Sequence, residues 1–116
     1  MEGLVLRFYV RENQRHHSVL LWQWLLDQAN HQGIRGGSAF RALAGFGSHH
    51  RLHEDHFLEL AGTLTVEVEF IVTAAEAREL LELLCAEGIR VFYTETPTRF
   101  GITGDDAAAA GSSAQA

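Results

Sequence analysis

Apolar and polar side chains alternate in the first predicted strand of this chain. In residues 4–10, "LVLRFYV", every even position is apolar, whereas the odd positions include Arg7 and Tyr9. A period of two residues is typical of a strand with one buried face. Residues 63–72, "TLTVEVEFIV", repeat this period with Glu67 and Glu69 on the polar side. Both segments are therefore predicted to be strands that cover one core.

Two further segments are predicted to be strands. In "SAFRALAGF", residues 38–46, alternation places Phe40 and the other even positions on the buried side, and Arg41 and Leu43 on the opposite side. A fourth strand, "IRVFYTE", precedes Pro97. Proline lacks the N–H that a sheet ladder needs, so this strand is expected to end before it.

The first predicted helix covers residues 19–33. Ser18 precedes an apolar stripe at helical spacing, and Gly33 follows it as a C-terminal cap. The stripe consists of Leu21, Trp22, Leu25, Leu26 and Ala29. Trp24 widens the apolar surface beyond this stripe.

The second predicted helix has the clearest boundaries. Thr73 and Glu76 have the spacing of a capping box, and Gly88 can end the helix. Cys85 falls at an apolar position of the helical pattern, so it is interpreted as a small core residue. Because it is the only cysteine, the chain cannot form an internal disulfide.

The resulting order, β-α-β-β-α-β, predicts an α+β, ferredoxin-like domain over residues 1–100, with two helices on one face of a four-stranded antiparallel sheet. Residues 101–116 are predicted to be a disordered tail. The other sheet face is left bare, and its mixture of apolar and charged residues suggests a homo-oligomer interface. This predicted interface comprises Val5, Arg7, Tyr9, Arg41, Leu43, Glu67 and Glu69, with Ile71 beside them. Arginine and glutamate side chains are expected to pair across its strands.

Charge and composition exclude several classes of protein. A net charge of −6 over 116 residues argues against a protein that coats nucleic acid. No segment reaches the roughly 18 consecutive apolar residues of a membrane span, and the N-terminus lacks a signal-peptide pattern, so a cytoplasmic location is expected. Up to His56 the chain has six arginines and five acidic residues, against three and ten afterwards. The first half is therefore the expected place for an anionic ligand, which arginine binds through its planar fork.

With these strands in place, the chain resembles the bacterial PII-like family catalogued as domain of unknown function 190. The resemblance extends from residue 4 to about residue 95, through "LRFYV", "QGIRGGSAFRALAGFG", "SHHRLH" and "LTVEVEFIV". Two departures are visible. The segment "RENQRHH" stands where the family usually has an acidic, glycine-containing turn, and Thr63 replaces a customary proline.

That family is in turn similar to the PII signal-transduction proteins. These are ferredoxin-like trimers that bind adenine nucleotides between subunits and carry a mobile loop between strands two and three. A Gly-Phe-Gly at the base of that loop lies near the nucleotide phosphates, and it matches "GFG" in this chain. The resemblance implies ligand contacts at Gly45, Phe46 and Gly47, and more loosely at Arg90 and Arg99. By their chemistry, the Ser48 hydroxyl and the Arg51 guanidinium could join them. Glycine amides can approach a phosphate closely, although a strand that simply ends in a bend would use the same glycines.

Histidines crowd the segment after this glycine motif. His50, His53 and His56 are spaced three apart and could hold a metal ion, yet they match no firm zinc spacing, and a solvated loop has the same composition. His16 and His17, before the first helix, are interpreted as surface residues. Since no nucleophile motif is recognisable, no enzymatic activity is expected.

Three functions remain open. The first is a homotrimeric regulatory protein that binds a small anionic ligand, for which the resemblance implies an adenine nucleotide, and that signals to a membrane transporter or enzyme through the loop between strands two and three. The second is a metal-binding trimer like the divalent-cation tolerance proteins. The third is an interaction module without a small ligand.

Overall fold

β1 (Glu2–Arg11) shows how the alternating sequence forms a sheet with one buried face. In the computed structural model, which describes residues 1–45 and 64–105, Leu6, Phe8 and Val10 are buried. Arg7 and Tyr9 point to the opposite face and remain partly exposed. The predicted orientation of the first strand is confirmed.

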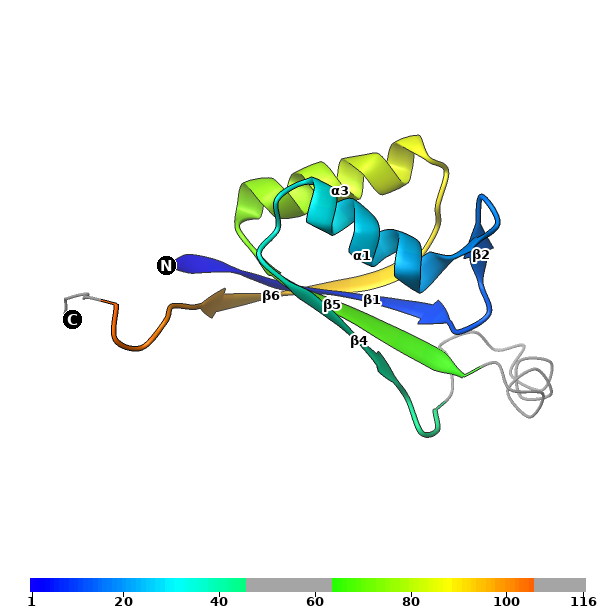
Figure 1. Cartoon of the computed structure of the whole chain (residues 1–116), viewed down its shortest axis with the longest axis horizontal. Helices are drawn as coiled ribbons and strands as arrows, with labels where there is room; N and C mark the ends of the chain where they lie inside the picture. Colours follow the sequence, from blue (N-terminus) through cyan, green and yellow to red (C-terminus); the bar gives the residue numbers. More distant parts are fainter. Residues whose placement is uncertain (46–63, 106–116) are drawn as a thin grey trace.

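The chain forms a ferredoxin-like α+β domain, as predicted. Over the described residues, a four-stranded sheet has the order β4-β5-β1-β6 with antiparallel neighbours, and two helices cover one face of it (Figure 1). The elements are β1, β2 (Arg15–His16), β3 (Val19–Leu20), α1 (Leu21–His31), β4 (Gly37–Arg41), β5 (Thr65–Val72), α3 (Ala74–Ala86) and β6 (Phe92–Arg99). The predicted neighbours of the third strand, strands one and two, are confirmed.

The core lies between the sheet and the two helices. Phe8 and Phe70 meet there edge to face, with ring centroids 6.3 Å apart. Side chains from α1 and α3 close the core from above, namely Leu21, Leu25, Ala29, Ala77, Leu80 and Leu84. Neither helix of the described residues has the length and apolar character needed to cross a membrane.

The predicted capping box of α3 and the predicted glycines after both helices are present. The Thr73 hydroxyl accepts a hydrogen bond from the Glu76 N–H at 3.1 Å, and the Glu76 carboxylate accepts one from the Thr73 N–H at 2.9 Å, which completes the capping box. Gly33 and Gly88 follow the helices with φ of 83° and 72°. Glycine adopts this left-handed conformation without a Cβ penalty.

A short hairpin before α1 was not predicted. β2 and β3 pair through a turn at His17 and Ser18, whose φ values of 53° and 67° are both left-handed. Ser18 therefore lies in a turn and does not precede the helix directly, and α1 begins only at Leu21. The turn was missed because neither residue is the glycine or asparagine that usually marks such a turn.

The prediction for β4 was wrong about its faces. Ala39 lies opposite buried Val68 and packs against the core, whereas Phe40 lies opposite Glu67 and is 52% exposed. The cause is the space beneath α1, where a Cβ on Gly37 would overlap the Phe70 ring. Only the small residues Gly37 and Ala39 fit beneath α1, so the larger Phe40 points to the opposite face of the sheet.

Two further expectations were wrong. Cys85 is exposed, because the buried stripe of α3 consists of Ala77, Leu80 and Leu84 and the next residue is turned about 100° around the helix axis. The last strand does not end before Pro97 but continues to Arg99. β6 is an edge strand, and an edge position can accommodate a residue that has no N–H to donate.

Candidate functional site

A cleft opens at the end of the sheet where β1 and β4 finish, beside the N-terminus of α1. Its volume is about 560 Å³. Its lining residues are Glu12, Asn13, Leu20, Trp22, Ala39, Arg41 and Val66. The cleft therefore combines an apolar wall that includes an indole ring with both signs of charge.

Glu12 joins the two chain segments that flank residues 46–63. Its Oε1 lies 3.0 Å from Nε of Arg41, at the end of β4, and its Oε2 accepts a hydrogen bond of 3.3 Å from the Leu64 N–H, just before β5. The backbone adds a bond of 2.8 Å from the Glu12 N–H to the Leu64 carbonyl oxygen. One side chain, only 18% exposed, thus holds both segments together.

Arg41 gives the cleft its capacity to bind an anion. The guanidinium is 68% exposed and contacts Glu12 through Nε. A guanidinium has five N–H donors in a planar fork, so its outer nitrogens can receive a carboxylate or phosphate while the Glu12 contact persists. Trp22 beside it offers a flat apolar surface to a ring-bearing ligand.

Arg41 and Leu43 were predicted on the open sheet face, and this placement is wrong. Arg41 lies opposite Val66 on the side of the sheet covered by the helices. The close approach of Gly37 to Phe70 sets the orientation of the whole strand, and Arg41 follows it. Leu43 lies beyond the end of β4 and is 96% exposed.

The predicted phosphate-binding motif is described only at its first residue. Gly45 is exposed and lies a few residues after Arg41, which ends β4. The other motif candidates lie outside the described residues, namely Phe46, Gly47, Ser48 and Arg51. The metal candidates His50, His53 and His56 also lie outside them.

Arg90 and Arg99 do not meet within one chain. Arg90 precedes β6 and Arg99 ends it, so the length of the strand separates them, roughly 25 Å at about 3.3 Å per residue. Both are exposed. Arg99 lies at the opposite end of the sheet from Arg41, so it could reach the cleft only from another copy of the chain (Figure 1).

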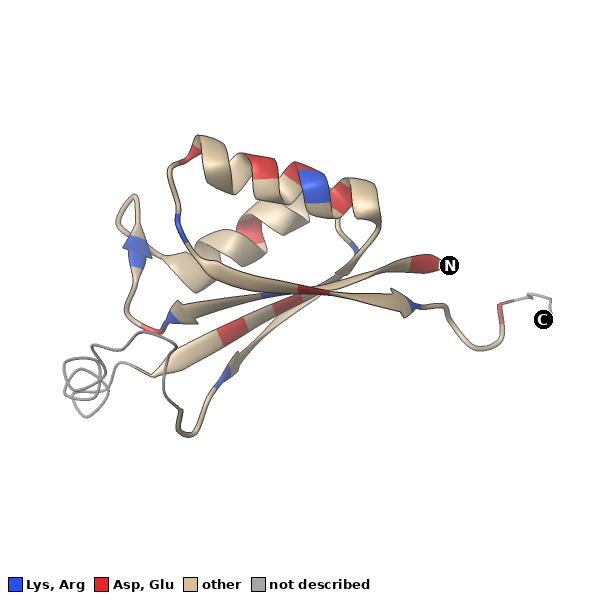
Figure 2. Ribbon diagram, turned by 180° about the vertical axis from the view of Figure 1, so that it is seen from behind, with Lys and Arg blue, Asp and Glu red and all other residues tan. Residues whose placement is uncertain are grey.

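The open sheet face has the predicted cross-strand charges. The Nε atom of Arg7 lies 3.7 Å from Glu67 and 3.8 Å from Glu69, and Figure 2 shows this acidic pair along β5. Val5 and Tyr9 share the face with Arg7 on β1. Three apolar side chains of this face are more than 40% exposed, namely Phe40, Ile71 and Phe92.

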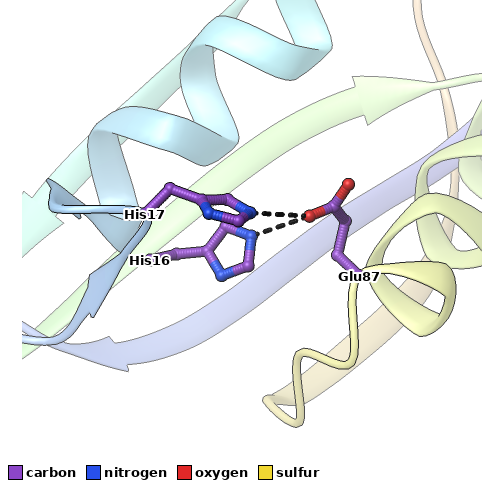
Figure 3. Close-up of polar contacts among 3 residues, drawn as sticks. All are labelled: His16, His17 and Glu87. Atoms are coloured by element: carbon purple, nitrogen blue, oxygen red, sulfur yellow. Dashed lines mark hydrogen bonds and ion pairs between the residues drawn. The ribbon is translucent and has the colours of Figure 1, made fainter.

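A second polar cluster, missed from the sequence, joins the hairpin to the end of α3. The Nε2 atoms of His16 and His17 lie 2.9 and 3.3 Å from Oε1 of Glu87 (Figure 3). The hydrogen bond from His16, and then that from His17, lowers the pKa of Glu87 below its usual value. His16 was interpreted as a surface residue, but its side chain is only 16% exposed. The sequence signal for this cluster was the pair of adjacent histidines. Their acidic partner is 71 residues away, so the sequence did not identify it.

Comparison with known proteins supports the fold and the family. The model of the DUF190 family, described as "Uncharacterized ACR, COG1993", matches residues 3–92. The chain is also 27% identical over 97 residues to the "UPF0166 protein" of Aquifex aeolicus (strain VF5), a match that covers 77% of this chain and 92% of that protein. The family match includes β4, β5, both described helices and nearly all of β1, and it stops at Phe92, the first residue of β6. The chain therefore belongs to the DUF190 family, a family of PII-like fold.

Proposed function

We propose that this protein is a homotrimeric, PII-like regulatory protein of the cytoplasm that binds a small anionic ligand, an adenine nucleotide, between subunits. The ligand lies in the cleft beside Arg41, at the base of residues 46–63. The role is regulatory and not enzymatic. The observation that carries the proposal is the exposed Arg41 guanidinium, held by Glu12 between the two ends of that segment.

The chemistry of the cleft supports this ligand class. Arg41 supplies the donors for a phosphate, and the cleft is open enough to admit a group of nucleotide size beside Trp22. Gly45 follows a few residues later, where the resemblance to PII proteins implies backbone contacts to phosphate. A purely apolar cleft would favour a different class of ligand.

The same ion pair offers a route for the signal. An anion that takes donors from Arg41 weakens the attraction between Arg41 and Glu12, and Glu12 also holds Leu64. Ligand binding is therefore coupled to the two ends of residues 46–63. A ligand shifts such an equilibrium by the difference between its affinities for the two states. A membrane transporter or enzyme that contacts residues 46–63 would respond to this shift in the equilibrium.

The trimer is supported by the open sheet face. Ile71 and Phe92 are exposed there beside the charged network of Arg7, which fits a face covered by another subunit more closely than a solvated one. A trimer would also allow Arg99 of one copy to approach the cleft of another.

Equilibrium titration tests the ligand. Wild-type protein is titrated with ATP, ADP and AMP by calorimetry, beside Arg41→Gln and the matched control Arg78→Gln, which removes an equal charge from the exposed side of α3. Arg41→Gln is expected to weaken binding at least tenfold, because a charge-assisted hydrogen bond contributes about 1.5–3 kcal/mol. Arg78→Gln is expected to bind like the wild type. Absence of saturable binding by the native oligomer would refute the proposal.

Sedimentation equilibrium tests the trimer separately. Ile71→Lys places a charge on the open face and is expected to dissociate the oligomer. Val19→Lys is the control, because this residue is also exposed and apolar but lies on the hairpin. A monomeric wild-type protein, or an Ile71→Lys protein that remains trimeric, would contradict the proposed interface.

A further inference from the structure

The cluster of His16, His17 and Glu87 brings three metal-ligating atoms to one point. The two Nε2 atoms and the carboxylate oxygen all lie within 4.8 Å of one another. The histidines come from the hairpin, and the glutamate is the C-cap residue that follows α3 (Figure 3). Neither the anion cleft nor the oligomer interface uses these residues.

We propose that this cluster binds a divalent transition metal ion of the zinc type. Two imidazole nitrogens and one carboxylate oxygen are ligands that zinc commonly takes, at about 2.0–2.2 Å. A tetrahedral ion with such bonds holds neighbouring ligand atoms roughly 3.4 Å apart. The nitrogen-to-oxygen distances of 2.9 and 3.3 Å lie close to this value, and the two nitrogens, which lie within 4.8 Å of each other, reach it by an adjustment of the side chains.

The backbone is shaped to bring both histidines to one side. Consecutive residues of a strand point to opposite faces, so adjacent histidines would not normally bind the same ion. Here His17 leaves the strand with φ of 53°, followed by Ser18 at 67°, a conformation that non-glycine residues adopt only at a cost. The Arg15 guanidinium donates a hydrogen bond of 3.0 Å to the Ser18 carbonyl oxygen and braces this turn.

The first histidine is also fixed by packing. The His16 ring lies edge to face on Trp24, with centroids 4.8 Å apart, which limits its rotamers before any ion binds. The His17 side chain is 71% exposed. An ion would thus be held by one fixed ligand and two adjustable ones, with its remaining position open to water. A three-ligand site with an open position is the arrangement of zinc sites that bind a further molecule.

Titration with Co²⁺ tests this site, since tetrahedral Co²⁺ is visible by its absorption. Tag-free protein, first treated with a chelator, is titrated with Co²⁺ and then with Zn²⁺ as competitor. The expected result is one ion per chain at this cluster and a rise in Tm on binding. Glu87→Gln and His17→Asn are expected to weaken binding at least tenfold. Asparagine tolerates the left-handed φ of residue 17, so the second variant should keep the turn.

Two controls locate the ion. His31→Ala removes one histidine that lies on α1, where its Nδ1 contacts the Asp27 carbonyl oxygen. A double variant, His50→Ala with His53→Ala, removes two of the histidines in residues 46–63. Both are expected to retain the tetrahedral Co²⁺ spectrum. The proposal is overturned if wild-type protein shows no saturable binding, if Glu87→Gln and His17→Asn bind as tightly as wild type, or if the spectrum is lost only in the double variant.

Discussion

Glu12 and Glu87 each connect segments that are distant in sequence, but they do so in different ways. The two oxygens of Glu12 have separate partners, a guanidinium with a permanent charge and a backbone N–H. Glu87 presents a single oxygen to two imidazole nitrogens. The first arrangement satisfies its carboxylate, whereas the second concentrates three ligand atoms at one point. The difference separates a structural clamp from a site that suits a cation.

Burial sharpens this contrast. The Glu12 side chain is 18% exposed and that of Glu87 is 34% exposed. A carboxylate removed from water needs its partners to offset the cost of desolvation, so breaking the Glu12 contacts should affect folding. The more exposed Glu87 can lose its partners to water at little cost. Substitution of each glutamate by glutamine should therefore change different properties of the protein.

Metal affinity should show the largest difference. Glu87→Gln is expected to weaken Co²⁺ binding at least tenfold, because glutamine offers a neutral oxygen in place of the anionic one. Glu12→Gln should leave Co²⁺ affinity unchanged, since its carboxylate is not part of the cluster. Competition with a chromophoric chelator measures both. Equal losses in the two variants would indicate a global effect and not a site.

Stability of the metal-free protein should show the next largest difference. Glu12→Gln is expected to lower the free energy of unfolding by about 1 kcal/mol, because Arg41 loses its charged partner and the Leu64 N–H loses an anionic acceptor. The loss from Glu87→Gln should be smaller, since water replaces its exposed contacts. Urea denaturation followed by circular dichroism compares them. A larger loss from Glu87→Gln would reverse this ranking.

Nucleotide affinity should show the smallest difference, with the opposite sign. Glu12→Gln removes a negative charge from the cleft and releases Arg41, so ATP is expected to bind about threefold more tightly. Glu87→Gln should not change ATP affinity. Calorimetry on metal-free protein provides the comparison. Weaker ATP binding by a folded Glu12→Gln variant would mean that Glu12 orients Arg41 for the ligand and does not compete with it.

Local patterns were sufficient to predict most of the fold. The alternation in β1 and β5 and the capping box of α3 depend on neighbours in sequence, and the structure confirms all three. The faces of β4 were not predictable in this way. They depend on how closely Gly37 approaches Phe70, which is a long-range contact.

The candidate sites were predicted less completely, for a related reason. The second strand was predicted to extend to Phe46, whereas β4 ends at Arg41, so Gly45 of the glycine motif lies beyond the strand. The contacts of Glu12 with Arg41 and of Glu87 with His16 join residues that only the folded chain brings together. The turn at His17 also has a left-handed backbone conformation that its sequence does not predict.

The position of the bound anion is the central claim, and amide chemical shifts test it most directly. A second hollow of about 510 Å³, with Arg35 and Phe100 among its lining residues, lies at the other end of the sheet and provides an internal comparison. With saturating ATP, we expect the largest shifts at the amides of Ala42 and Leu64 and at the Trp22 indole. Shifts confined to the hollow near Arg35, or no shifts at all, would contradict the proposed site.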